Sequence, residues 1–422
     1  MVDYPFSRAT DAFVDLSSQD AFNEGLPCAT FDRLRREDPM AWIDMADGSR
    51  GFWNVTRHAD LLDLNRQPDL LSSARGIRME DQTADEFEAR KTFQETDAPE
   101  HRAFRALVAK AFSRSTVAGF EGQIRKIVTD LLDVALGAGE FDAVDAIARK
   151  LPMQMLAQIM GVPEADGAWL VEKGDALISN ADPDYTDFVI DKVDTDAYRF
   201  LPFRSPSAIE LFDYADSLLD RMAAGEQIGV LNLVLDETSH GTRMSRDAFK
   251  NFFCLLVAAG NDTTRYSLSA TLHALANDPA LLAQIQRSDF AHWDEATDEM
   301  IRWASPTTHF RRTATRDFDY HGKSVKAGDK VLLWFASGNR DETAIPDPYT
   351  IDLKRPRNPF LSFGQGGPHI CLGMWLAKLE VKIVMQELAL RVRRIEQTAQ
   401  HSYLRSNFIH GIKHLPLKVE QI

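Results

Sequence analysis

The stretch FGQGGPHICLG at residues 363–373 runs directly into MWLAKLEVKIVMQEL, so it joins a glycine-rich loop, a single cysteine and an apolar-periodic helix. Gly364, Gly366 and Gly367 allow the backbone to turn tightly and to approach a flat object closely. Cys371 lies where the first helical amides point toward its sulfur, an environment that favours a thiolate. The stretch therefore predicts a rigidly held cysteine at the start of a helix.

A thiolate on a rigid loop, with no second cysteine in reach, suits one axial ligand of a haem iron. Phe363 is expected to shield the sulfur, and His369 to meet a haem carboxylate. For the loop taken alone, a free buried cysteine beside a turn is the alternative. The sequence around the loop decides between the two.

Composition limits the class of protein. The chain has 422 residues, 44% of them hydrophobic, and shows no linker, repeat or low-complexity tract. A net charge of −15 argues against a general nucleic-acid binder, since no basic stripe is present to neutralise phosphates. Cys28, Cys254 and Cys371 are far apart, which offers no zinc site or disulfide framework and fits a reducing cytoplasm.

A membrane anchor is not expected. The N-terminal stretch MVDYPFSRATDAFVDL is polar and lacks the apolar core of a signal peptide. The longest apolar run, Phe252–Gly260, is too short to cross a bilayer. We therefore expect a cytoplasmic, soluble protein.

Most of the chain shows helical periodicity. Turn residues between the strand-like runs 41–45 and 51–56 predict a hairpin, and the apolar run 330–336 predicts a further strand. The polar segment 72–92 shows little periodicity and is expected to be a functional or mobile loop, whereas the acidic, aromatic segment 180–206, interrupted by prolines, is expected to be a lid loop, with a plain solvated loop as the alternative. Helices are expected at 31–36, 59–65, 96–113, 120–160, 207–222 and 245–277, and a C-terminal hairpin at 406–416.

The helix expected at 96–113 carries two basic residues on one face. Asp97 is the expected cap, and His101 and Arg105 follow four residues apart. Two donors at that spacing can reach the same anionic group, with a solvated basic face as the alternative. Arg102 points elsewhere on the helix and is expected at the surface.

The long helix at 245–277 contains a polar interruption, Gly260-Asn261-Asp262-Thr263-Thr264. Threonine hydroxyls can bond back to helix carbonyls and weaken the ladder, which predicts a local opening here. Asp262 and Thr263 form an acid–alcohol pair able to relay protons. A simple helix kink with exposed polar residues is the alternative.

These segments, with Glu299-Met300-Ile301-Arg302 placed between them, resemble the cytochrome P450 monooxygenases in order and separation over roughly residues 50–420. The resemblance implies a mainly α fold with a small β region, the cytochrome P450 fold, as a single domain over residues 1–422. It also implies haem b (iron protoporphyrin IX) bound between the helix at 245–277 and the loop at 363–373.

The resemblance also assigns roles to residues. Cys371 would be the axial ligand of the haem iron, and Asp262 and Thr263 would deliver protons during oxygen activation. Glu299, Arg302 and Arg355 would form a structural ion network behind the haem, while Arg311 would turn outward. The other residues expected to contact the haem are His101, Arg105, Arg312, Phe363, His369 and Gly373.

The implied reaction is insertion of one oxygen atom of O2 into a C–H bond. Electrons would come from a ferredoxin and its ferredoxin reductase, because no flavin or iron–sulfur module is fused to the chain, and Arg102 is the first candidate for docking. A peroxide-driven peroxygenase is the alternative enzyme, but those relatives tend to replace the acid–alcohol pair. A haem-binding sensor without turnover is the other alternative, and it would have no use for a proton relay.

The substrate is expected to be hydrophobic. One extra residue separates Phe363 from Cys371 compared with the commonest bacterial spacing, and this feature and the ending FIHGIKHLP resemble the subgroup acting on sterols and methyl-branched lipids. An apolar, uncharged pocket favours hydrocarbon at the reacting end. We therefore expect terminal hydroxylation of a sterol side chain, branched lipid or terpenoid, with a small aromatic or monoterpene as runner-up. The expected pocket residues are Leu255, Ala258, Ala259, Thr307, Thr308, Phe408 and Ile409.

Overall fold

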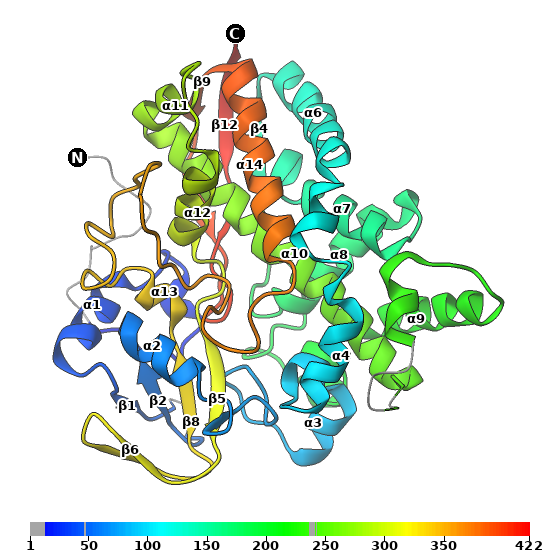
Figure 1. The fold of residues 1–422 in the computed structure, drawn as a ribbon, viewed down its shortest axis with the longest axis vertical. Helices are drawn as coiled ribbons and strands as arrows, with labels where there is room; N and C mark the ends of the chain where they lie inside the picture. The colour runs from blue at the N-terminus through cyan, green and yellow to red at the C-terminus, as the bar shows by residue number, and fades with distance from the viewer. Residues whose placement is uncertain (1–12, 46–47, 236–240, 242) are drawn as a thin grey trace.

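Helix α10 (Arg246–Asn277) runs through the middle of the molecule (Figure 1). Its first turn is capped by Ser245, whose Oγ accepts a hydrogen bond from the backbone N of Ala248 at 3.1 Å. Side chains from Phe252 to Ala258 are buried on all sides of the helix, which is typical of a core element. The helix is therefore the element around which the helical half is packed.

The computed structural model describes residues 13–45, 48–235, 241 and 243–422. The other α-helices are α1 (Cys28–Glu37), α2 (His58–Asn65), α3 (Ala84–Arg90), α4 (Glu100–Ala109), α5 (Arg114–Ala118), α6 (Glu121–Ala138), α7 (Lys150–Met160), α8 (Gly167–Ile178), α9 (Ser207–Ala223), α11 (Pro279–Ile285), α12 (Trp293–Ala304), α13 (Phe335–Gly338) and α14 (Met374–Arg391). Short helical turns of other types are η1 (Asp20–Phe22), η2 (Phe93–Glu95), η3 (Val144–Ala148), η4 (Glu164–Asp166), η5 (Asp196–Tyr198), η6 (Pro202–Arg204) and η7 (Gly229–Leu235).

The strands form four small sheets. The largest has the order β1-β2-β8-β5-β3, in which β8 pairs in parallel with β2 and antiparallel with β5. The others have the orders β4-β12-β9, β10-β11 and β6-β7. The strands are β1 (Trp42–Ile43), β2 (Phe52–Val55), β3 (Leu71–Ser72), β4 (Glu140–Asp142), β5 (Phe310–Ala314), β6 (Phe318–Tyr320), β7 (Lys323–Val325), β8 (Lys330–Leu333), β9 (Val392–Gln397), β10 (Ser402–Tyr403), β11 (Ile412–His414) and β12 (Pro416–Gln421).

The helices and the largest sheet lie on different sides of the molecule. In Figure 1, β1, β2, β5 and β8 lie at the lower left, while α10, α12 and α14 fill the centre and top. α10, α12 and α14 pack against one another, and α7, α8 and α9 pack on α10. One large hydrophobic core extends from Leu16 to Leu417, and a smaller one covers the five-stranded sheet. The fold is mainly α with a small β region, as predicted.

Several expected elements are present with shifted ends. The hairpin expected at 41–56, the helix expected at 59–65 and the long helix expected at 245–277 are confirmed. The helix expected from residue 96 begins only at Glu100, and Asp97 does not cap it. Instead the Asp97 carboxylate accepts hydrogen bonds from Ser72 Oγ at 2.5 Å and from the backbone N of Ser73 at 3.0 Å.

Other elements differ from expectation. The stretch expected to be helical over 120–160 is interrupted by Gly139, with φ of 74°, and by β4, which pairs with β12 from the chain's other end. The polar segment 72–92 contains helix α3, capped by Thr83 and Glu86. α10 continues through residues 260–264 without the predicted opening, although Thr263 Oγ1 does bond back to the carbonyl of Ala259 at 3.2 Å.

Within the described ranges, no helix combines the length and the apolar character that crossing a membrane requires. Of the polar N-terminal stretch, residues 1–12 lie outside the described part of the chain.

Candidate functional site

The cysteine loop, residues 363–373, is a tightly folded glycine-rich turn that leads directly into α14. Gly364 and Gly366 have φ of 68° and 97°, a backbone conformation that favours glycine. A Cβ on Gly367 would lie 2.6 Å from the carbonyl oxygen of Asn65, so glycine is required there by close approach. The backbone N of Cys371 donates to the carbonyl of Phe363 at 2.9 Å, which closes the loop.

Cys371 is the one cysteine of the three with an accessible side chain; Cys28 and Cys254 are buried. Protein nevertheless surrounds it closely enough that burial raises the pKa of its thiol, against the opposing effects of the Gly373 and Met374 backbone amides and of Arg105. The amide donors expected from the sequence are present, but the effect of burial on the pKa outweighs theirs.

Two histidines and two arginines gather beside the loop. The rings of His101, on α4, and His369, on the loop, have centroids 3.9 Å apart. Burial, with neighbouring cations, lowers the pKa of His101 to about 4 and that of His369 to about 2. His101 Nε2 and His369 Nδ1 are buried, and among the described residues neither has a hydrogen-bond partner.

Arg312 and Arg105 complete this group. Arg312 is 5% exposed, and the hydrogen bonds of its guanidinium to described residues go to the carbonyl of Arg311 at 2.9 Å and to Asn65 Oδ1 at 3.4 Å. Burial lowers its pKa to about 10. Arg105 Nη2 donates to the carbonyl of Ile370 at 2.6 Å. Buried cationic donors without a tight anionic partner fit a ligand that carries carboxylates, as haem does.

Arg311 and Arg312 point to opposite faces of β5, as neighbours in a strand must. The expectation that Arg311 turns outward is wrong, because it is only 6% exposed. Its Nη1 donates to the carbonyl of Glu80 at 3.0 Å and to Asp81 Oδ1 at 3.1 Å. It therefore holds the segment that precedes α3 against the sheet.

The two residues of the acid–alcohol pair on α10, Asp262 and Thr263, lie in different surroundings. Thr263 faces the large cavity of the molecule. Asp262 is fully buried, with Oδ1 accepting from Arg265 Nη2 at 2.5 Å and Oδ2 accepting from Ser179 Oγ at 2.9 Å. Burial raises the pKa of Asp262 to about 7, against the pull of Arg265. The carboxyl is thus poised near neutral pH, one residue from the hydroxyl that reaches the cavity.

Arg265 links Asp262 to a second buried acid. Its Nη1 donates to Asp175 Oδ1 at 2.7 Å, and Arg149 Nε donates to Asp175 Oδ2 at 2.7 Å. This network joins α10 to α8 and to Arg149, the residue directly before α7, and was not foreseen from the sequence.

Glu299, Arg302 and Arg355 meet in one buried network. Arg302 donates to both oxygens of Glu299 at 2.8 Å, and Arg355 Nε donates to Oε2 at 3.0 Å. Burial alone would raise the pKa of Glu299, but the two guanidinium groups hold it below its usual value. Arg302 Nη1 also donates to the carbonyls of Asn339 and Pro348 at 2.9 and 2.8 Å, so the network holds the loops that precede the cysteine loop.

A cavity of about 740 Å³ lies over α10. The residues expected to line it all do so except Thr308: Leu255, Ala258, Ala259, Thr307, Phe408 and Ile409. Thr308 is fully buried behind the wall, where its hydroxyl bonds to the carbonyls of Asn407 and Phe408. The β10–β11 hairpin carries Phe408 and Ile409 into the cavity, and Ile409 forms a β-bridge with Thr307.

The cavity also has a charged part that was missed. Arg78, Glu80, Arg90, Glu95 and Arg204 belong to its lining. Two of these arginines lie in the segment 72–92, whose polar character was visible in the sequence, but no periodicity indicated which residues would face inward. The expectation of an uncharged lining holds for the α10 side only.

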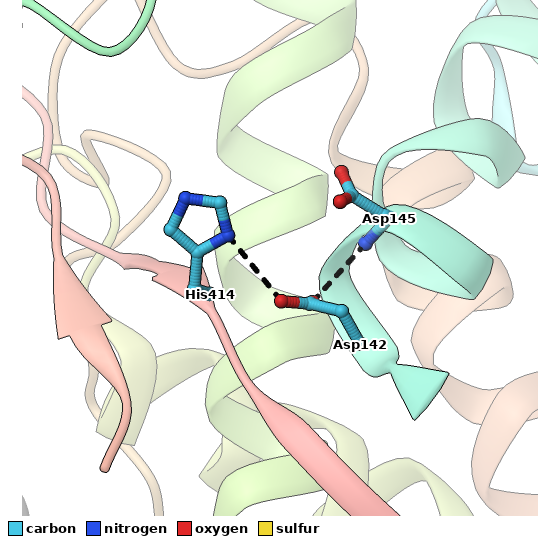
Figure 2. Close-up of side chains that lie close together, drawn as sticks. All are labelled: Asp142, Asp145 and His414. Atoms are coloured by element: carbon cyan, nitrogen blue, oxygen red, sulfur yellow. Dashed lines mark hydrogen bonds and ion pairs between the residues drawn. The ribbon is translucent and has the colours of Figure 1, made fainter. Parts of the chain in front are cut away.

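A separate polar cluster lies away from this cavity. Figure 2 shows Asp142, Asp145 and His414, whose ligand-type atoms lie within 4.8 Å of one another. Asp142 Oδ1 accepts from the backbone N of Val144 at 2.8 Å, and Oδ2 lies 3.3 Å from His414 Nδ1. These bonds begin η3 and fasten it to β11, so we assign the cluster a structural role.

Comparison with known proteins agrees with this geometry. Residues 292–402 match the family model described as Cytochrome P450. The "Methyl-branched lipid omega-hydroxylase" of Mycobacterium tuberculosis is 33% identical over 96% of this chain and 94% of its own length. The "Linalool 8-monooxygenase" of Pseudomonas putida is 32% identical over 95% of this chain and 97% of its own.

A solved structure supports the same conclusion. A cytochrome P450 of Mycobacterium marinum in complex with pseudoionone superposes with a TM-score of 0.87 and 32% identity, covering 98% of this chain and 99% of that one. The predicted fold is thereby confirmed. The chain belongs to the cytochrome P450 family of monooxygenases.

Proposed function

We propose that the chain is a haem-thiolate monooxygenase that hydroxylates a C–H bond of a hydrophobic lipid-like or terpenoid-like substrate. The overall change is R–H + O2 + 2H⁺ + 2e⁻ → R–OH + H2O. The observation that carries this proposal is the grouping, around the loop that holds Cys371, of the unpartnered His101 and His369 nitrogens with the buried Arg312. When bound there, haem b supplies the oxygen-activating redox chemistry.

The residues proposed to hold the haem divide by the part of the group they meet. Cys371 would hold the haem iron through its sulfur; the loop around it is closed by the Phe363 carbonyl, and the Gly373 amide donates to the sulfur. His101, Arg105, Arg312 and His369 offer donors to the two haem carboxylates. A carboxylate would satisfy the buried nitrogens and offset the cost of burying Arg312.

Thr263 and Asp262 are proposed to move protons. The Thr263 hydroxyl lies at the cavity wall, where it donates to the Ala259 carbonyl at 3.2 Å; by turning away from that carbonyl it can donate a hydrogen bond to a group in the cavity. Asp262, with its pKa raised to about 7, can take up and release a proton near neutral pH. Its release from Arg265 and Ser179 is the motion that this role requires.

The α10 side of the cavity favours hydrocarbon at the reacting end of the substrate. Leu255, Ala258 and Ala259 form an apolar wall next to Thr263, and the small alanines leave room for a chain end or branched methyl group. Burial of such a group contributes about 25 cal/mol per Å². With the names of the relatives, this supports terminal hydroxylation of a branched lipid, sterol side chain or terpenoid. A small aromatic or monoterpene remains the runner-up, because α3 and the segment around it close one side of the cavity.

We further propose that a ferredoxin delivers the electrons on the cysteine side of the molecule. Arg102 is exposed on α4, the helix whose Arg105 contacts the cysteine loop. Arg114, exposed on α5, lies 5.0 Å from the ring of Trp375 at the start of α14. Both cations flank the loop, where an acidic partner would find charge complementarity despite the chain's negative net charge.

The direct test is turnover with labelled dioxygen. The haem-loaded protein, a ferredoxin and a ferredoxin reductase would be incubated with a methyl-branched fatty acid, a sterol and a small aromatic compound. We expect one labelled oxygen atom in a terminal alcohol of the lipid or sterol. Product formed only from added peroxide would favour the peroxygenase, and no product under either condition would favour a sensor.

A further inference from the structure

The charged part of the cavity contains three arginines with unequal partners. Arg90 donates from Nε and Nη2 to Gln82 Oε1 at 2.9 and 2.6 Å. Arg204 Nη2 donates to Glu86 Oε1 at 3.1 Å, which fastens η6 to α3. Both are therefore engaged in contacts between elements of the cavity wall.

Arg78 is held differently. Its Nη2 reaches Asn180 Oδ1 at 3.4 Å, and its Nε lies 3.5 Å from Glu80 Oε2, beyond a good hydrogen bond. Nε is buried, and within the described part of the chain it has no hydrogen-bond partner. The side chain is 18% exposed and belongs to the cavity wall. A guanidinium this deep, with only long contacts, retains donors for a further acceptor.

Two aromatic rings lie close to the Arg78 guanidinium. Its guanidinium carbon lies 5.2 Å from the ring centroid of Phe408 and 5.6 Å from that of Phe203. Phe408 comes from the C-terminal hairpin and Phe203 from the segment before α9, so segments distant in sequence hold one side chain between them. Held against two rings, the guanidinium loses little further freedom when it binds.

The backbone around Phe203 is strained in order to reach this position. Phe203 and Arg204 have φ of 58° and 51°, which non-glycine residues seldom adopt. Asn180 Nδ2 donates to the carbonyl of Phe203 at 2.6 Å and so holds the ring in place, while Asn180 Oδ1 faces Arg78. Strain of this kind persists where the surroundings over-determine it, and such residues cluster at ligand sites.

The neighbouring acids indicate which ligand chemistry fits. Glu80 lies close to Arg78, and Arg78 contributes to lowering the pKa of Glu80 against the effect of burial. Glu95 also lines the cavity, and burial raises its pKa to about 7. The positive charge of Arg78 is therefore partly balanced already. The site suits an oxygen acceptor and does not require a full negative charge.

We propose that Arg78 anchors an acceptor oxygen, of a carbonyl or carboxylate group, at the end of the substrate remote from the hydroxylated carbon. The hydrocarbon part then extends along Leu255, Ala258 and Ala259 toward Thr263. This deepens the proposed function and rests on it. It names the substrate class as an amphipathic molecule, with hydrocarbon at the reacting end and an oxygen function at the other.

The test compares three ligands with one carbon skeleton: a long methyl-branched methyl ketone, the matching carboxylic acid, and the parent alkane. Dissociation constants for the haem-loaded protein would be measured by calorimetry, which does not depend on turnover. Hydrogen bonds to a charged group predict that the wild type binds the ketone or the acid about 10- to 100-fold more tightly than the alkane. If the wild type binds only the ketone, or only the acid, more tightly than the alkane, that ligand shows which kind of oxygen group the site accepts.

The variants are Arg78→Leu, which removes the donors, and Arg78→Lys, which keeps the charge but loses Nε–H and the planar fork. Arg75→Leu is the matched control, since Arg75 is exposed in the same segment and is not among the residues lining this cavity. We expect Arg78→Leu to bring the affinity for ketone and acid down to that for the alkane, whose own affinity stays unchanged. Arg78→Lys should recover part of the preference, and Arg75→Leu should keep all of it.

A preference that survives in Arg78→Leu would overturn the inference, as would an equal loss for all three ligands, which indicates a structural role. Either result would leave the monooxygenase proposal standing if labelled oxygen still enters the product. If binding depends on Arg78 but no hydroxylated product forms, the role of Arg78 in ligand binding would be supported and the proposed monooxygenase reaction would be contradicted.

Discussion

Arg105 Nη2 donates a hydrogen bond of 2.6 Å to the carbonyl of Ile370, the residue that precedes Cys371. This single contact joins α4 to the cysteine loop across 265 positions of sequence. It brings His101, one turn earlier on α4, against His369 of the loop. The position of the cysteine and that of the buried histidines are thus coupled through one guanidinium group.

The first prediction concerns haem retention. His101→Leu and His369→Leu each remove a buried nitrogen proposed to meet a haem carboxylate, so each should weaken haem binding by about tenfold, the worth of one good hydrogen bond. Transfer of haem from the variants to an excess of an apo-haem protein would measure the loss. His292→Leu, on an exposed histidine, is the control. Unchanged transfer rates in both variants would remove these histidines from the site.

Thr263→Ala should separate electron use from product formation. The variant loses the hydroxyl at the cavity wall, and a positioned proton donor typically contributes ~10²–10⁴-fold. Substrate binding should persist, while reducing equivalents appear as hydrogen peroxide. Thr271→Ala is the matched control on the same helix, where the hydroxyl bonds back to the Ser267 carbonyl at 2.7 Å. Equal coupling in Thr263→Ala and in the wild type would contradict the relay.

Glu380 of α14 should make stability depend on pH. It is 1% exposed, its Oε1 has no hydrogen-bond partner within the described chain, and burial raises its pKa to about 8. Between about pH 4.5, where the unfolded chain titrates, and about pH 8, the folded state holds a proton that the unfolded state lacks. Protonation of Glu380 therefore contributes fully to the free energy of unfolding below about pH 4.5, and this contribution is lost as the pH rises from about 4.5 to about 8.

Glu380→Gln removes this titration. Its stability relative to the wild type should rise with pH by on the order of a few kcal/mol between about pH 5 and about pH 9. Urea unfolding of both proteins across that range measures the difference. Glu295→Gln, with a side chain 44% exposed, should show no such trend. A pH-independent difference for Glu380→Gln would show that the carboxyl is charged in the folded state.

Reduction by a ferredoxin should depend on salt and on Arg102. Complementary charges mainly raise the association rate, and exposed charges are screened by salt. We expect Arg102→Glu to slow the second-order reduction rate at low ionic strength and to flatten its salt dependence. Arg199→Glu, on the segment before α9, is the control. Rates that respond neither to salt nor to Arg102→Glu would place the docking surface elsewhere.

The sequence predicts best where one local feature determines the geometry. The glycines, Cys371 and the helix after them form a continuous segment, and α10 follows from its apolar length and its Ser245 cap. Helix α3 was missed although Thr83-Ala84-Asp85-Glu86 is a capping-box pattern, because the segment is short and lacks an apolar stripe. That pattern was the available signal.

What remained hidden depends on contacts between distant segments. Strand β4 exists because β12 pairs with it from the other end of the chain. Arg311 is buried because the segment before α3 folds over β5, and Arg78 lies in the cavity wall near Phe203 and Phe408, which come from distant segments. Local periodicity contains no information about such pairings, so the charged part of the cavity had to come from the structure.

The central claim is that Cys371 holds a haem iron through its thiolate. The most direct measurement is the carbon-monoxide difference spectrum of the reduced, haem-loaded protein, recorded for the wild type, Cys371→Ser, Cys28→Ser and Cys254→Ser. We predict the thiolate-type spectrum in the wild type and in the variants of the two buried cysteines, and its loss in Cys371→Ser alone. A thiolate-type spectrum that survives in Cys371→Ser, or that disappears in Cys28→Ser or Cys254→Ser, would contradict the assignment.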